Sequence, residues 1–449
     1  MKVKKLVALG LAAVMTLSLA ACGGGSSDSS SSSSDSASSE GGGELNVWLE
    51  KIFTDDANNA MEERINSFAE EQGVTVNVEF ISATDFTTKL NAAVEAGNVP
   101  DVVTSAVTKI VNYYPSNPFL DVTDLVEEIN SERPYLEAIS EGSKIEDKNY
   151  FVPMTSSSTM MFIRKDKMEE AGLTELPKTW DEVFEYAEKM SDPDNGFYGL
   201  AMGCGPTDED GENMFRNIMW NQGGYVFDKD GNITLDNDAA KELLTKYKEM
   251  YDNGVIPPAA STWDSGGNNT SYLMGESAIV MNAPTMYNSM MTDDSYADLL
   301  ENTEVMSLPA GSDNNATMGF AAGPAIMKDS KNIDLAKELI RYLFDSEWYD
   351  QYLEITAPVY APVFQDCKDS ETWSQGVNAQ VLSYAENSTG YYGYPVESTR
   401  GRAVAAKSYF TFPMSNMMNQ VVTGAADVDT AIANAVQDLE ELDATVQDE

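Results

Sequence analysis

The sequence predicts an α/β protein built from two domains, and two observations carry this prediction. Alternating apolar residues predict strands at 45–49, 74–80 and 101–103, and helical periodicity between them predicts helices at 61–72 and 86–96. Strands that alternate with helices are typical of a largely parallel sheet with helices on its faces. About 400 residues follow residue 43, more than one hydrophobic core usually supports, so two domains are expected.

The N-terminal segment predicts export and a lipid anchor. Three lysines precede an apolar run at 6–19, which is shorter than the roughly 20 residues that span a bilayer. The run ends in the letters LAACG, which resemble the lipobox of bacterial lipoproteins. We therefore expect a signal peptide at 1–21 and lipid attachment at Cys22; an ordinary secretory signal with a chance cysteine is the alternative.

Residues 22–43 are almost entirely small or polar and predict a disordered Ser/Gly tether. A long hydrophilic linker after the lipid-bearing cysteine is typical of the outer face of a Gram-positive membrane. The folded body is therefore expected at the extracellular face of the cell membrane, held there by the lipid alone.

Composition removes several classes of function. The net charge of −45 repels nucleic acid and anionic membranes, so neither is an expected partner. The chain has no histidine, which excludes Ser-His-Asp and Cys-His catalysis and His-ligated metals. Besides Cys22 there are only Cys204 and Cys367, too few for a structural zinc site and expected to be buried thiols. No cofactor is predicted.

Further elements are predicted along the chain. Helices are expected at 180–190 with Thr179 as N-cap, and at 239–251, 335–344 and 428–442, and a hairpin at 223–235. The acidic residues Asp228 and Asp230 flank its turn and invite a calcium-loop interpretation. Gly231 comes too early for an EF-hand loop, which favours a plain turn.

A set of short segments resembles family 1 of the bacterial extracellular solute-binding proteins, the group that contains maltose-binding protein. Their order and spacing carry the resemblance rather than any one of them. The segments are AGNVPDVV at 96–103, YFVP at 150–153, FIRKD at 162–166, AGL at 171–173, PKTWDE at 177–182, MGESAIVMN at 274–282 and the stretch 319–325. One departure is Thr285, which stands after Pro284 where the family places a pocket aromatic, with Tyr287 two residues on.

The resemblance implies a two-lobed, periplasmic-binding-protein-like fold with three crossings between the lobes and the ligand in the cleft. The crossings fall near 155–158, 320–323 and Pro395. Lobe 1 is then 44–155 plus 324–394, and lobe 2 is 156–323 plus 395–449. Cys204 and Cys367 fall on different lobes, which argues against a permanent disulfide between them.

Candidate ligand-binding residues follow from what a sugar presents, apolar C–H faces and a rim of hydroxyls. In lobe 1, Trp48 and Glu50 come at the end of the first strand and Ser105 follows the third, where open α/β sheets bind ligands. Trp48 as a packed core residue is the alternative. Ser156 and Ser157, at the first crossing, either bond a hydroxyl or satisfy backbone groups.

Lobe 2 contributes a second group of candidates. Trp263 and Asp264 share a loop of small polar residues, and Tyr287 follows the segment where the family places stacking aromatics. Arg400 is a candidate for a two-bond contact to hydroxyls, with a surface ion pair equally favoured. Phe410 and Phe412 are expected to close the pocket. Trp220 is expected in the core.

These features predict a monomeric, non-enzymatic carbohydrate-binding lipoprotein of an ABC importer, whose permease partner is implied by the resemblance. An oligosaccharide is favoured over a monosaccharide. A binder of polyamine or peptide on the same fold is the main alternative, and a cationic ligand would need several acids in the pocket. A glycosidase is a second alternative, and it would need two carboxylates roughly 5 to 10 Å apart across one cleft.

Overall fold

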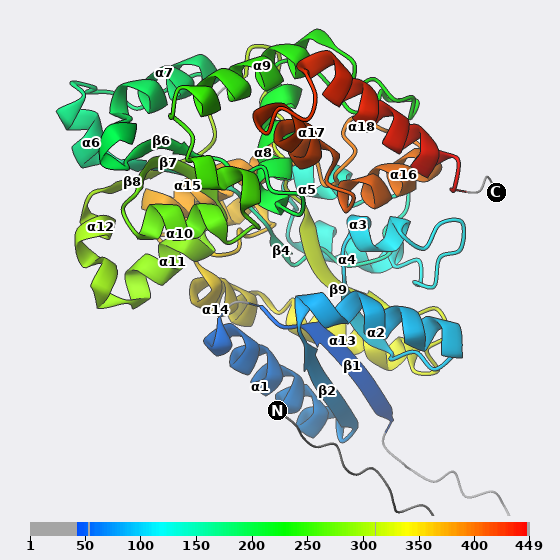
Figure 1. Cartoon of the computed structure of the whole chain (residues 1–449). Helices are drawn as coiled ribbons and strands as arrows, with labels where there is room; N and C mark the ends of the chain where they lie inside the picture. The colour runs from blue at the N-terminus through cyan, green and yellow to red at the C-terminus, as the bar shows by residue number, and fades with distance from the viewer. Residues whose placement is uncertain (1–42, 53, 310, 447–449) are drawn as a thin grey trace, which may run out of the picture. The chain divides into compact units, whose positions relative to one another are not determined.

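The computed structural model describes residues 43–52, 54–309 and 311–446. The predicted signal peptide, the predicted lipid-attachment site Cys22 and all of the predicted tether except Gly43 lie outside these residues. The described chain forms two sheets, each covered by helices, and thus the two predicted lobes (Figure 1). The α/β, two-lobed fold class is confirmed.

The first lobe contains a mixed sheet with strand order β2-β1-β3-β9-β4. β1 pairs in parallel with β2 and β3, as predicted, but β9 returns antiparallel beside β3 because it enters from the second lobe. In β1, Leu45, Val47 and Leu49 point into the core. The strands are β1 (Glu44–Glu50), β2 (Thr75–Ile81), β3 (Val102–Ser105), β4 (Thr155–Ser156) and β9 (Ala321–Ile326).

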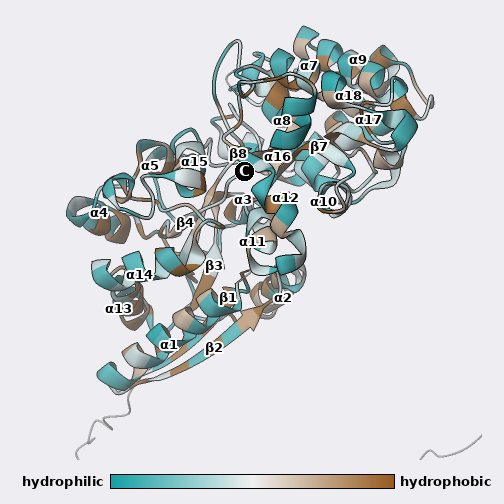
Figure 2. Cartoon of the chain, turned by 90° about the vertical axis from the view of Figure 1, so that its left-hand side faces the viewer, coloured by the Kyte–Doolittle hydropathy of each residue, from teal (hydrophilic) through white to brown (hydrophobic). Residues whose placement is uncertain are grey.

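Helices α1, α13 and α14 pack together on the face of this sheet that carries Leu49. α2 lies on the other face, so that β3 runs between two helical layers (Figure 2). The helices of this part are α1 (Asp55–Gln72), α2 (Ala83–Ala96), α3 (Val107–Val111), α4 (Thr123–Glu132), α5 (Glu137–Gly142), α13 (Ile333–Leu343), α14 (Ser346–Thr356), η4 (Gln365–Asp369) and α15 (Gly376–Glu386).

The second lobe is built on a sheet of order β6-β7-β5-β8. β6 and β7 are parallel, and β5 is antiparallel to both of its neighbours. The strands are β5 (Met160–Arg164), β6 (Tyr198–Ala201), β7 (Ser277–Asn282) and β8 (Thr303–Met306). The helices are α6 (Lys165–Glu170), α7 (Trp180–Met190), η1 (Pro193–Asn195), α8 (Glu209–Asn221), α9 (Asp238–Asp252), η2 (Pro258–Thr262), α10 (Gly267–Leu273), α11 (Thr285–Thr292), η3 (Asp294–Tyr296), α12 (Ala297–Glu301), α16 (Thr399–Tyr409), α17 (Pro413–Val422) and α18 (Val428–Asp443).

Local chemistry explains where the elements end. Gly73 and Gly97 stop α1 and α2 in the left-handed conformation, with φ of 64° and 65°. The Thr179 side chain caps α7 by accepting from the Glu182 N–H at 3.3 Å, as predicted. α1 begins at Asp55 rather than at 61, because its first turn is polar and acidic and gives no apolar periodicity.

The predicted hairpin at 223–235 is reduced to one antiparallel bridge between Phe227 and Ile233. The Asp228 carboxylate holds the turn itself. Its Oδ1 accepts from the N–H groups of Asp230 and Asn232, and its Oδ2 accepts from the Asn232 amide. The plain turn is therefore the better description of this loop.

Three connections between the lobes lie side by side and are hydrogen-bonded to one another. In the first, Ser157 donates its N–H to Phe320 O of the second at 3.1 Å. The third is joined to the second where Thr389 N–H donates to Thr317 O at 3.0 Å and Gly390 N–H to Gly319 O at 2.8 Å. Just before the third connection, α15 packs on α5 of the first lobe and on β5 and β8 of the second.

The core confirms two further predictions. Cys204 and Cys367 are free and buried, Cys204 after β6 and Cys367 in η4, so they belong to different lobes. Trp220 is fully buried on α8. No helix in the described residues is long and apolar enough to cross a bilayer.

Candidate functional site

A cavity of about 270 Å³ opens at the carboxyl ends of β1 and β3, beside the first two connections between the lobes. Its wall is mostly apolar and comes from the strands, from α1, α13 and α14, and from the connections. The lining residues are Leu49, Glu50, Ile52, Asn58, Met61, Phe80, Thr104, Ala106, Lys109, Met154, Thr155, Ser157, Phe320, Ala322, Gly323, Pro324, Leu343, Tyr352 and Tyr360. Strand ends in open α/β sheets are where such folds bind ligands.

Glu50 and Lys109 form an ion pair in this wall. Glu50 is the last residue of β1 and Lys109 projects from α3, where its ammonium also lies 4.6 Å from the Phe86 ring centre. Their side chains are 26% and 28% exposed, so both remain accessible from the cavity. Burial lowers the pKa of the Lys109 amine to about 8. With both groups ionised, the pair carries no net charge.

The other polar groups of the wall are largely occupied by the protein. The Asn58 side chain bonds the backbone of Ile52 and Thr54. Thr104 Oγ1 accepts from the Glu50 N–H at 3.1 Å, and Ser157 Oγ donates to Phe320 O at 3.2 Å. These bonds hold the wall in shape and leave the ion pair as its most polar feature.

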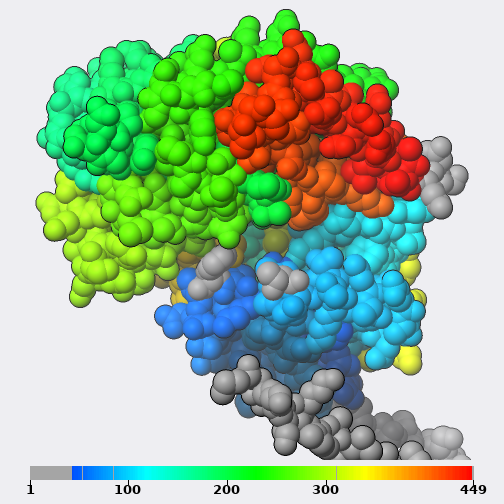
Figure 3. Space-filling view, viewed as in Figure 1, coloured from blue at the N-terminus to red at the C-terminus, as the bar shows by residue number. Residues whose placement is uncertain are grey.

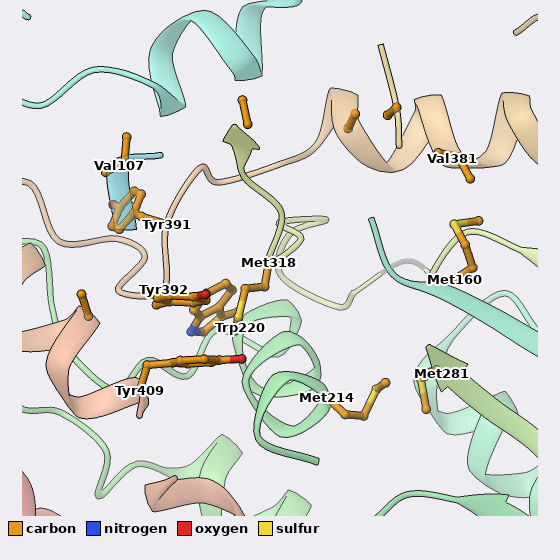
Figure 4. Close-up of a cluster of buried hydrophobic side chains, with 14 of the residues drawn as sticks. Val107, Met160, Met214, Trp220, Met281, Met318, Val381, Tyr391, Tyr392 and Tyr409 are labelled. Carbon is orange, nitrogen blue, oxygen red and sulfur yellow. The ribbon is translucent and has the colours of Figure 1, made fainter. Parts of the chain in front are cut away.

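An aromatic series leads from the cavity toward the second lobe. The Phe320 ring meets Tyr392 edge-on at 5.5 Å, and Tyr392 lies flat against Tyr409 at 3.8 Å (Figure 4). Phe410 packs edge-on against both tyrosines and is 53% exposed. A half-buried ring at the cavity and an exposed ring beyond it are the kind of surface on which sugar C–H faces pack.

The first-lobe candidates do not all reach the cavity. Glu50 and Ser157 line it. Trp48 is half-buried on the opposite face of the sheet from Leu49, with the Lys89 ammonium 4.3 Å from its ring centre. Ser105 is buried between two lining residues, and its hydroxyl has no hydrogen-bond partner among the described residues. Ser156 is fully buried and bonds Ser157 O.

Trp263 and Asp264 line a different cavity, of about 620 Å³, in the second lobe. It lies between η2 and α10 beside Tyr198 and Glu276, at the start of β6 and β7. Asp264 accepts from the Gly266 N–H at 3.0 Å, which fixes the loop. The structure therefore does not bring these two residues together with Glu50 and Ser157.

The remaining candidates lie elsewhere in the second lobe. Tyr287 is half-buried in the first turn of α11. Arg400 donates to the Asp443 carboxylate at 2.7 Å and to the backbone oxygens of Asp443 and Val446, so it ties α16 to the end of α18, as the ion-pair alternative expected. Phe412 adopts a left-handed conformation, φ 53°, at the start of α17.

Four acids gather at the start of α8, behind the aromatic series. Asp208 Oδ1 accepts from two helix N–H groups, but its buried Oδ2 has no partner among the described residues. Asp210 accepts from the amides of Asn268 and Asn282, both at 2.9 Å. Burial raises the pKa of Asp208 to about 7 and that of Asp210 to about 6. Glu209 accepts from the Tyr409 hydroxyl at 3.0 Å.

The fourth acid, Glu212, is fully buried with Arg216, their closest atoms 2.7 Å apart. Its second oxygen accepts from the N–H groups of Met414 and Ser415 at the start of α17. This pair joins α8 to α17. No group of three or more acids or cysteines in the described part of the chain is arranged to hold a metal ion.

Sequence reasoning missed Lys109 and Tyr392. Lys109 lies just beyond the third strand and is one of few cations in an acidic chain, which could have marked it. Nothing near Tyr392 in the sequence indicates that it stacks on Tyr409.

A two-lobed α/β fold with a cavity at its strand ends, beside two of the three bonded connections, defines a class of binding proteins rather than a single activity. The family model of the bacterial extracellular solute-binding proteins matches residues 43–350. This is more than half of the chain, and the chain therefore belongs to that family, whose members are transport binding proteins.

Some individual relatives are distant in sequence but match nearly the whole chain. A galactooligosaccharide-binding protein of Bacillus subtilis is 25% identical over 446 residues, 95% of this chain and 92% of the relative. A maltooligosaccharide ABC transporter solute-binding lipoprotein of Streptococcus pneumoniae is 24% identical over 461 residues, 96% of each. The solved GacH receptor of Streptomyces glaucescens, 18% identical, matches the fold with a TM-score of 0.71 over 90% of this chain and all of its own.

Proposed function

We propose that this protein captures an uncharged carbohydrate outside the cell and delivers it to the permease of an ABC importer. The observation that supports this most is the cavity at the ends of β1 and β3, apolar over most of its wall, with the half-buried Phe320 ring in that wall and the exposed Phe410 ring at the far end of the aromatic series. Rings for the sugar faces and a few polar groups for the hydroxyls are what a carbohydrate site requires. The names of the relatives point to oligosaccharides.

The residues that line the cavity also argue against a polyamine binder and against a glycosidase. A polyamine would need unpaired carboxylates, but among the described lining residues the one carboxylate, Glu50, is paired with Lys109. A glycosidase would need a second carboxylate across the same cavity. Binding without chemical change is therefore favoured, and we expect the sugar to leave as it entered.

The proposal includes an anchor and a hinge. Cys22 carries the lipid, which holds the body at the extracellular face of the membrane, a Gram-positive one as the tether length favours. The three connections bend when the ligand binds, so the sugar shifts an open–closed equilibrium between lobe 1 (44–155 plus 324–394) and lobe 2 (156–323 plus 395–449). Replacing Cys22 by Ser should release the protein into the medium; a variant that stays with the membrane contradicts the anchor.

Calorimetric titration tests the function. The protein is titrated with arabinotriose, galactotriose, maltotriose and spermidine, and the sugars are recovered and analysed by chromatography. We expect one neutral sugar to bind with a Kd near micromolar, about −8 kcal/mol, and to be recovered intact. Tight binding of spermidine alone, or shortened sugars in the recovered sample, would overturn the proposal.

A further inference from the structure

The cavity wall contains an ion pair between Glu50 and Lys109. Among the described residues that line the cavity, Glu50 has the only carboxylate and Lys109 the only basic side chain. Both come from the first lobe, Glu50 from β1 and Lys109 from α3. The pair is therefore formed without any residue of the second lobe. A ligand that first contacts the first lobe would meet the pair already formed.

The pair still has hydrogen-bonding capacity. Lys109 contacts Glu50 through Oε2, and among the described residues no other hydrogen bond is made by either side chain. An ammonium has three donors and a carboxylate two acceptor oxygens, so both donors and acceptors remain. Two neighbouring hydroxyls of a sugar ring, one donating to Glu50 and one accepting from Lys109, would use them. Such bonds to ionised groups are stronger than bonds between neutral ones.

We propose that Lys109 is a specificity-determining residue: through its pair with Glu50 it makes the cavity electrically neutral, so that the protein selects neutral sugars and rejects uronic acids and amino sugars. This rests on the proposed function and adds the ligand class. An ionised ligand would lose its hydration in this mostly apolar cavity without meeting a net opposite charge. A neutral sugar loses much less hydration and gains charge-assisted bonds.

The pair thereby predicts what each single substitution does. Glu50→Gln leaves the Lys109 ammonium uncompensated, so the cavity becomes cationic and should favour a carboxylate. Lys109→Met leaves the Glu50 carboxylate uncompensated and should favour an amine. The same two residues therefore shift the preference in opposite directions. A residue that only supports the fold would weaken all ligands alike.

The probes are arabinotriose, galactotriose and maltotriose, each with two derivatives: one with a terminal CH₂OH oxidised to a carboxylate, and one with a 2-hydroxyl replaced by an amine. The wild type should bind a neutral trisaccharide at least about tenfold more tightly than either charged derivative. Glu50→Gln should shift the ratio by about tenfold toward the carboxylate, and Lys109→Met by about tenfold toward the amine. The double variant Glu50→Gln/Lys109→Met, neutral again, should return to the wild-type preference with weaker binding.

The Glu188–Lys246 pair between α7 and α9, 2.6 Å apart and 45% and 35% exposed, supplies matched controls. Glu188→Gln and Lys246→Met change the net charge by the same amounts away from the cavity and should leave the ratios unchanged. Thermal unfolding checks that each variant folds.

The outcomes separate the two proposals. Neutral binding by the wild type with ratios that move less than twofold in both cavity variants, or that move equally in the controls, overturns the role of Lys109 and leaves the proposed function standing. A wild type that binds no neutral trisaccharide of the set, or prefers a charged derivative, overturns the proposed function and this inference with it.

Discussion

Each lobe contains an ion pair between a glutamate and a basic residue, and the two pairs differ in how far their side chains are exposed to solvent. Glu50 and Lys109 in the first lobe are about one quarter exposed and border a cavity. Glu212 and Arg216 in the second lobe are completely buried and join two helices. Figure 3 shows the two lobes in surface view, the first mainly in blue and cyan with some yellow from its later segment, and the second mainly in green and in orange to red. A charged pair is available to a ligand only where the fold leaves part of it open to solvent.

The largest effect should come from the buried pair. Arg216→Met leaves Glu212 buried without its cation, and breaking a buried pair in this way costs roughly 3–5 kcal/mol. We expect the free energy of unfolding in urea to fall by that amount. If the free energy of unfolding falls by less than about 1 kcal/mol, Glu212 is easily protonated in the variant, and the pair stabilises the protein no more than a surface pair does.

The second effect concerns pH. The folded pKa of Asp208, about 7, is raised above the ordinary value of 3.8 because the carboxyl is buried. Asp208 therefore adds stability below about pH 4, and this is lost as the pH rises through about 7. The contribution is roughly 4 kcal/mol, from a shift of about three pKa units at about 1.4 kcal/mol per unit.

Asp208→Asn should flatten the rise in stability between pH 7 and pH 4.5, measured by urea unfolding at both values. Asp238→Asn, at an exposed first-turn position of α9, serves as the control and should keep the wild-type slope. An unchanged slope in Asp208→Asn would show that this carboxyl is ionised in the folded protein across the range.

A third prediction sets the two cavities against each other. Phe320→Ala removes the ring at the edge of the first cavity and should weaken sugar binding by roughly 1–3 kcal/mol, about 5- to 150-fold. Trp263→Ala alters the second cavity and should change sugar affinity less than threefold. Titration calorimetry measures both. If Trp263→Ala has the larger effect, the ligand lies in the second lobe and the first cavity is not the site.

The smallest effect should come from the exposed Glu188–Lys246 pair, 45% and 35% exposed. Each of Glu188→Gln and Lys246→Met should cost less than 1 kcal/mol in urea unfolding, because solvent screens exposed charges. Measured beside Arg216→Met, these variants give the scale on which the buried pair is judged. A loss of more than about 2 kcal/mol in the free energy of unfolding would show that exposed and buried pairs do not differ in the way proposed.

Local signals predicted local structure well. The period of apolar residues and the Thr179 cap predicted α7 at its observed bounds, and the alternation at 45–49 predicted β1. Parallel pairing of the first three strands also followed from the strand–helix order. The antiparallel β9 did not, because its pairing depends on a return from the other lobe far along the chain.

The site was predictable only in part, for the same reason. Glu50 was expected at a strand end, which is a local property. Its partner Lys109 lies 59 residues away, and no sequence pattern links them. Arg400 was equally compatible with a ligand and with an ion pair until α18 was placed beside it, 43 residues on. Charge partners are set by the tertiary fold, which residue type and spacing do not encode.

The three bonded connections have a thermodynamic consequence for ligand capture. Gly390 lies so close to Gly142 that a Cβ on it would sit 2.4 Å from Gly142 O, and its N–H is bonded to Gly319 O. We expect connections joined in this way to bend together, because twisting would shear the hydrogen bonds between them. The lobes would then have one easy direction of relative motion instead of several. In the proposed closure little orientational freedom would be left to lose, so more of the contact energy with a sugar would appear as affinity.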